Sequence, residues 1–182
     1  MEHLYYLVAQ LPAFTVNGES TAKLPITTEY FKDLCMRFMN EKDRKVAQNL
    51  SLEPPREKVS TGSAFLDEWY EKERNLRFAL AQVRAQKMKK EANLVPITTD
   101  GEVIQAARTA TGMDSPLSAE QFLNEYRLGV LDKIAPLDMF SVDAVYSYGL
   151  KLMLTERMKK FNRDEGLASY HKIYDEILGE KK

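Results

Sequence analysis

The chain has 182 residues, of which 44% are hydrophobic and 29% are charged, as in an ordinary folded domain, so a disordered chain is excluded. Its 26 Lys and Arg residues nearly balance 27 Asp and Glu residues, which excludes the strongly basic surface of a general nucleic-acid-binding protein. One cysteine excludes an internal disulfide, and two histidines leave little for a transition-metal site.

Membrane and export signals are missing from the sequence. No apolar run approaches the ~20 residues that a bilayer-spanning helix needs. The first ten residues lack the cationic segment of a secretory signal. We therefore expect a cytoplasmic protein that does not insert directly into a membrane.

The first third of the chain predicts short helices. Tyr5–Ala9 has the composition of a short strand, but no second strand pairs with it, so we expect a helical turn. Residues 27–50 carry apolar side chains at helical spacing, with a break predicted near residues 40–43. Two consecutive prolines, Pro54 and Pro55, end this region.

The longest predicted helix covers residues 63–91. Its apolar residues follow steps of 4, 7, 4 and 3, the period of an amphipathic helix. Twenty-nine helical residues would be ~43 Å long, whereas a compact domain of this size is about 41 Å across. We therefore expect an elongated molecule. The residues of this seam are Phe65, Trp69, Leu76, Leu80 and Val83.

The second half of the chain predicts four more helices. Asp100 can cap the first, which runs to about Thr111. Ser118 and Gln121 form a capping box for the second, which runs to about residue 136. Ser141 can cap the third, which continues towards residue 162, and residues 167–178 form the fourth.

These elements predict an all-α fold, an elongated bundle of six or seven helices with one long central helix. We treat residues 1–182 as a single domain, and two helical sub-lobes, 1–94 and 95–182, as a finer hypothesis. One short echo is visible, because residues 65–70 (FLDEWY) recur as residues 122–127 (FLNEYR). Six positions leave open whether a helical unit was duplicated.

Catalytic motifs are missing from the sequence. It contains no glycine-rich phosphate loop and no H-E-x-x-H metal motif. His3 and His171 lie far apart in the sequence, and Cys35 lies among apolar residues, which favours a buried structural thiol over a nucleophile. We expect no enzymatic activity, no cofactor and no metal site.

Glu73 is the most informative polar residue, because it continues the apolar seam of the longest helix. Arg77 lies one turn further on the same face, so the two side chains can form an ion pair. A charge in a seam is costly unless it is paired. Two interpretations stay open: an interhelical clamp or docking contact, or a stripe that rotates and leaves Glu73 at the solvent boundary.

Seven residues are candidates for a protein interface. Arg84 and Lys87 begin a basic run that could meet an acidic partner, although a solvated helix end is the simpler interpretation. Aromatic side chains offer apolar area, and tyrosine adds a polar tip. The aromatic candidates are Tyr5, Tyr6, Trp69, Tyr170 and Tyr174.

Two stretches resemble a known group of proteins. Residues 3–12 (HLYYLVAQLP) resemble the Y-Y-L-V-A-x-L-P opening of an uncharacterised bacterial family encoded beside V/A-type ATPase subunits. More distantly, this opening is similar to the start of the C-type subunit of V/A-type ATPases, which is the d-type subunit in eukaryotes. Residues 71–80 (EKERNLRFAL) and 84–87 (RAQK) are similar to helices of this C-type subunit that carry an acid, then N-L-R or N-L-K, then R-A-K.

The resemblance implies a shortened all-α scaffold, because the C-type subunit has roughly twice this length and seats the central stalk on the membrane ring without performing chemistry. It implies a non-catalytic structural or coupling component. Its partners would be ATPase stalk or membrane-ring subunits, at the inner face of the membrane. A freestanding helical adaptor or regulator is the main alternative. Two further alternatives remain. The chain could be an enzyme without recognisable motifs, or it could bind nucleic acid through residues 84–90.

Overall fold

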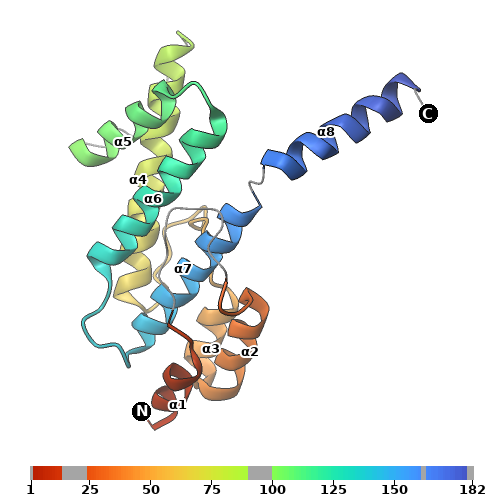
Figure 1. Cartoon of the computed structure of the whole chain (residues 1–182). Coiled ribbons are helices and arrows are strands. Elements are labelled where there is room, and N and C mark those ends of the chain that lie inside the picture. Colours follow the sequence, from red (N-terminus) through yellow and green to blue (C-terminus); the bar gives the residue numbers. More distant parts are fainter. Residues whose placement is uncertain (1, 14–23, 90–99, 161–162, 180–182) are drawn as a thin grey trace.

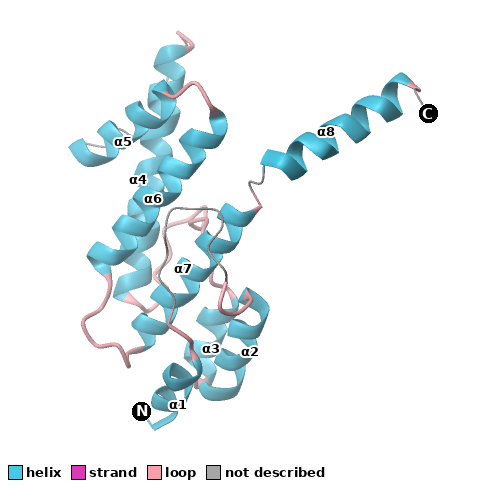
Figure 2. Ribbon diagram, in the orientation of Figure 1, coloured by secondary structure: helices cyan, strands magenta, loops and turns pink. Residues whose placement is uncertain are grey.

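A computed structural model describes residues 2–13, 24–89, 100–160 and 163–179, which fold into α-helices without a strand (Figures 1 and 2). The all-α prediction is confirmed, and this part of the chain holds eight helices rather than six or seven. The helices are α1 Glu2–Gln10, α2 Thr28–Phe38, α3 Glu41–Gln48, α4 Ala64–Lys87, α5 Gly101–Gly112, α6 Pro116–Ile134, α7 Val142–Lys159 and α8 Arg163–Leu178.

The predicted break near residues 40–43 separates α2 from α3. Met39 and Asn40 leave the helical conformation, and the Asn40 side chain accepts a hydrogen bond from the backbone N–H of Asp43. An asparagine in this position satisfies one of the free N–H groups that begin a helix. The expected turn at residues 5–9 is part of α1, which covers nine residues.

The longest helix, α4, has 24 residues and is therefore ~36 Å long. It begins as predicted, because Ser63 accepts a hydrogen bond from the backbone N–H of Leu66. The Ser63 hydroxyl also donates to Asp143 at 2.6 Å, which joins the starts of α4 and α7. The helix ends at Lys87, earlier than the predicted residue 91, because Met88 and Lys89 form a turn in which Lys89 has a φ of 53°. Residues 90 and 91 themselves lie outside the described residues.

Caps define the later helices. Asp100 and Ser141 cap α5 and α7 as predicted, each accepting from backbone N–H groups in the first turn. The predicted capping box at Ser118 is wrong, because Ser115 is the cap and accepts from the backbone N–H of Ser118. Pro116 explains the earlier start, since proline fits the first helical position, where no N–H is needed.

Two hydrophobic clusters hold the helices together. The first contains large side chains such as Phe31, Trp69 and Tyr146, from α2, α4 and α7. The second joins the later part of α4 to α5 and the early part of α6, and half of its buried residues are alanines. Both α4 and α6 contribute to both clusters, so these two helices connect the ends of the body (Figure 1).

The boundary of the hypothetical sub-lobes, between residues 94 and 95, lies outside the described residues. Each cluster contains residues from both sides of that boundary.

The last helix, α8, extends away from the other seven described helices in Figure 1. Every side chain from Gly166 to Leu178 is exposed. This differs from α7, the preceding helix, which contributes many residues to the first cluster.

Candidate functional site

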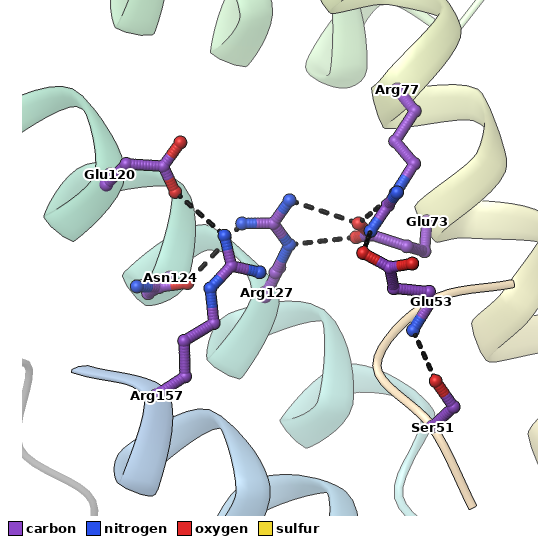
Figure 3. Close-up of polar contacts among 8 residues, drawn as sticks. All are labelled: Ser51, Glu53, Glu73, Arg77, Glu120, Asn124, Arg127 and Arg157. Carbon is purple, nitrogen blue, oxygen red and sulfur yellow. Dashed lines mark hydrogen bonds and ion pairs between the residues drawn. The ribbon is translucent and has the colours of Figure 1, made fainter. Parts of the chain in front are cut away.

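Glu73 is buried between α4 and α6, with 2% of its surface exposed. Arg127 of α6 donates to it twice, from Nε to Oε2 at 2.9 Å and from Nη2 to Oε1 at 3.0 Å (Figure 3). Arg77 donates from Nε to Oε1 at 2.9 Å. One carboxylate is thus neutralised by two guanidinium groups on two helices, with hydrogen bonds that are strong because both partners are charged.

The structure places Glu73 in an ion pair between two helices, as the clamp interpretation expects, and its burial contradicts the solvent-boundary interpretation. Arg127 decides between them, because it brings a charge of opposite sign from a neighbouring helix into the seam. The clamp lies between the two hydrophobic clusters, with Trp69 of the first and Leu76 of the second on the same helix. It therefore joins α4 to α6 through a buried charge that is paired on both sides of the helix contact.

Four arginines line a cavity of about 520 Å³ beside the clamp, which we call the arginine cleft. The cleft lies between α4, α6, α7 and the loop after α3, and its apolar lining comes from Leu52, Leu80, Leu123 and Met153. Ser51, Glu53 and Glu120 complete it. The four arginines are Arg77, Arg84, Arg127 and Arg157.

The arginines differ in how they are paired. Arg77 lies 3.6 Å from Glu53, and Arg157 donates to Glu120 at 3.1 Å (Figure 3). Arg84 is exposed and has no ion-pair partner among the described residues. The arrangement can hold an anion, but it contains no nucleophile paired with a base.

Arg127, Arg157, Glu120 and Glu53 were not anticipated from the sequence. The sequence pattern that singled out Glu73, a charged residue within an apolar seam, also applies to Arg127. It lies four residues after Leu123 and four residues before Leu131. It is also the last residue of the short echo. The other three were not singled out: Glu120 lies on α6 itself, whereas Arg157 on α7 and Glu53 in the loop after α3 reach the cleft only through the tertiary fold.

The seven interface candidates do not form one surface. The prediction for Trp69 is wrong, because this side chain is 1% exposed and packs inside the first cluster with the other buried residues of the α4 seam. Tyr5 and Tyr6 are exposed on α1, with the Tyr5 ring centroid 4.7 Å from that of Phe140. Lys87 donates to the backbone carbonyl of Thr111 at 3.0 Å and so links α4 to the end of α5.

The exposed apolar side chains of α8 form one stripe. Tyr170 and Tyr174 stack within it, with ring centroids 5.9 Å apart. The residues recur at the spacing of one helical face, and each is between 49% and 78% exposed. Single exposed apolar residues are normal, but a contiguous apolar surface marks an interaction site. The α8 stripe consists of Leu167, Tyr170, Ile173, Tyr174, Ile177 and Leu178.

The structure describes Cys35 and His171 but not the side chain of His3. Cys35 is fully buried, and this burial raises the pKa of its thiol to about 12, so the reactive thiolate is not formed near neutral pH. His171 is exposed on α8, and its ring lies beside that of Tyr170.

Among residues 2–13, 24–89, 100–160 and 163–179, no three His, Cys, Asp or Glu side chains lie close enough together to hold a metal ion. No helix in these ranges combines the length and apolar character needed to span a membrane. Comparisons of the chain with known protein families, with curated proteins and with solved structures found no match.

Proposed function

We propose that this chain is a non-catalytic structural or coupling component associated with a V/A-type rotary ATPase, in a position similar to that of the C-type (or d-type) subunit of the central stalk. The helical body acts as a spacer, in effect a shortened form of the C-type scaffold built along α4. The α8 stripe is the surface that meets an ATPase stalk or membrane-ring subunit. It carries the proposal, since it joins an exposed apolar face to a folded body.

The α8 stripe is suited to docking because its apolar area is covered by nothing in the described chain. Moving apolar surface out of water is favourable by roughly 25 cal/mol per Å². An amphipathic helix with anchors at such spacing binds by laying its apolar face into a groove or against another helix. Tyrosine contributes large contact area and a hydroxyl that tolerates water at the rim.

The body is suited to transmitting a position because its parts are held in fixed register. The Glu73–Arg127 clamp joins α4 to α6, and the hydrogen bond between Thr28 and Glu156 joins α2 to α7. The ATPase assignment itself rests on the two stretches that resemble the ATPase-associated family and the C-type subunit. Of these, residues 3–10 lie in α1, and residues 71–80 and 84–87 lie in α4.

The test is capture of the amino-terminally tagged full chain from its native membranes in mild detergent, with bound proteins identified by mass spectrometry. We expect ATPase stalk and ring subunits in a fixed ratio, together with sedimentation of the untagged chain with the membranes. The double variant Ile173→Asp/Ile177→Asp should lose these partners. The matched control is Ala168→Asp/Ser169→Asp, which adds the same charge to exposed positions outside the stripe.

A freestanding helical adaptor is the second candidate, favoured by the α8 stripe alone, because a soluble partner with an apolar groove would cover it equally well. Recovery of soluble proteins without ATPase subunits, lost again in the Ile173→Asp/Ile177→Asp variant, would select this alternative. Equal recovery of partners by the stripe variant and its control would contradict docking through α8 in both forms.

A further inference from the structure

We propose that the arginine cleft binds a small organic acid, a molecule with a single carboxylate attached to an apolar body. The proposal is independent of the ATPase assignment and of α8, because the cleft lies on α4, α6, α7 and the loop after α3. It rests on three properties of the cleft: two arginines fixed by Glu73, one positive charge without an ion-pair partner among the described residues, and an apolar lining.

Two of the four arginines, Arg127 and Arg77, are held in place before any ligand arrives, and they form a fixed positive wall of the cleft. Arg127 is 5% exposed, and its guanidinium is fixed by Glu73 on α4 and by the Asn124 side-chain oxygen at 3.4 Å (Figure 3). Arg77 is oriented by the same carboxylate. A site whose side chains are already ordered loses less conformational entropy on binding.

The charges of the cleft select a monoanion. Its four arginines face three carboxylates, those of Glu53, Glu73 and Glu120, so one positive charge is left over. Among the described residues, Arg84 is the arginine of the cleft that forms no ion pair, and one carboxylate would balance it. A phosphate monoester carries about −1.5 to −2 charges, and its surplus would face Glu53 and Glu120 at short range.

The available hydrogen-bond donors fit a carboxylate. Arg84 can offer a planar fork of two parallel N–H groups, the geometry that carboxylates accept. Arg157 donates one hydrogen bond, from Nη2 to Glu120, and its other N–H groups have no acceptor in the described chain. A carboxylate that meets Arg84 and Arg157 would thus be held by groups from α4 and α7.

The rest of the cleft accepts an apolar body. Leu52, Leu80, Leu123 and Met153 provide side chains without charge, and the volume of about 520 Å³ is within the range of small-molecule sites, roughly 300–1,000 Å³. An inorganic ion would use the arginines but leave this surface wet. The ligand class is therefore an aliphatic or aromatic acid rather than a simple anion.

The test is calorimetric titration of the purified full chain with phenylacetate, phenyl phosphate and inorganic phosphate, at constant ionic strength. We expect saturable one-site binding of phenylacetate, weaker binding of phenyl phosphate and no saturation with inorganic phosphate. Arg84→Gln and Arg157→Gln should each weaken phenylacetate binding about tenfold. Arg108→Gln is the matched control, because it removes an exposed arginine of α5 that does not line the cleft.

Two further measurements separate loss of the site from loss of folding. Melting temperatures show whether each variant is folded, and the Arg Nε–Hε resonances of the native protein show whether arginines respond during the titration. Unchanged folding with lost binding in the two cleft variants alone supports the site. Tighter binding of phenyl phosphate would overturn the carboxylate assignment, and the absence of saturable phenylacetate binding, or equal affinity in all variants, would overturn the site. Because the titration contains no membranes or partner proteins, its failure leaves the ATPase proposal to its own test.

Discussion

The two last helices, α7 and α8, are consecutive and similar in length, with 18 and 16 residues, yet their surroundings are opposite. Nine residues of α7 are buried, whereas every described side chain of α8 from residue 166 to 178 is exposed. Both helices carry apolar residues at helical spacing. The comparison teaches that such spacing predicts a helix but does not say whether its apolar face has a partner within the same chain.

A glycine in α7 allows this helix to pack closely against its neighbours. Gly149 lies where a Cβ atom would come within 2.6 Å of the Phe31 ring and 2.8 Å of the Leu50 side chain, so its missing side chain lets α7 pack tightly. α7 also contacts α2, α4 and α6. Gly166 of α8 has nothing within 4 Å of the same position, so any partner of α8 has to come from outside the described chain.

The largest expected loss of stability comes from breaking the Glu73–Arg127 clamp. This change should destabilise the body and leave α8 unaffected. Arg127→Ala removes two of the three hydrogen bonds to a buried carboxylate, and we expect the free energy of unfolding to fall by ~3–5 kcal/mol. Urea titration followed by circular dichroism measures it. Arg77→Ala is the control with a smaller expected loss, because Arg77 is partly exposed, and equal losses would contradict the clamp as described.

A second pair of variants compares the apolar faces directly. Leu150→Ala in α7 should cost ~2–5 kcal/mol, because Leu150 is fully buried. Ile177→Ala in α8 should change the stability of the isolated chain by less than ~0.5 kcal/mol, because Ile177 is 78% exposed. Thermal unfolding of the isolated protein is the measurement, and a large loss in Ile177→Ala would mean that α8 packs against the chain or a second copy in solution.

Alanine substitutions at the two glycines should have opposite effects, since one should destabilise the fold and the other should stabilise a helix. Gly149→Ala should destabilise the chain by ~1–3 kcal/mol, because the added methyl group overlaps the Phe31 ring. Gly166→Ala should instead raise the helical content of α8, since alanine is favoured over glycine in a helix by roughly 0.5–1 kcal/mol. Unfolding curves and the helical circular dichroism signal separate the two effects; a stabilised Gly149→Ala would show that the two helices pack less tightly than described.

A pH dependence is expected for the body, because burial makes two of its groups titrate only at high pH. Burial raises the pKa of Cys35 from 9.0 to about 12, so the folded state holds this proton more tightly than the unfolded state. The resulting stabilisation is complete below pH 9 and is lost as the pH rises from 9 to about 12.

Burial likewise raises the pKa of Tyr148 from 10.0 to about 12, which adds to the loss above pH 10. We expect Cys35→Ala to show a shallower decline in unfolding free energy from pH 9 to 12, measured by urea titration at each pH. A slope equal to that of the native chain would rule out Cys35 as a cause.

Much of the local structure was predictable because its causes are local. The predicted caps Asp100 and Ser141 act on backbone groups within their own first turn, so a short window of sequence reveals them. The error at Ser118 was also local, since Ser115 and Pro116 offered a better start three residues earlier. Glu73 and Arg77 were found for the same reason, because they lie one turn apart.

The candidate sites were predictable only in part. The apolar spacing that singled out Tyr170 and Tyr174 is a property of α8 alone, but the same reasoning placed Trp69 at an interface when it lies in the core. Arg127 could have been predicted from the sequence, because it is a charged residue within the apolar seam of its helix. The arginine cleft was not, because Arg157 and Glu53 reach it from elements distant in the sequence.

The sequence by itself determined that this protein is helical, where most of its helices begin, and that Glu73 needs a partner, because these depend on contacts within a few turns. The tertiary structure alone decided which partner that is, which apolar faces are covered and which stays exposed. The physical reason is that burial and pairing are properties of two surfaces at once, and a sequence pattern describes one surface at a time.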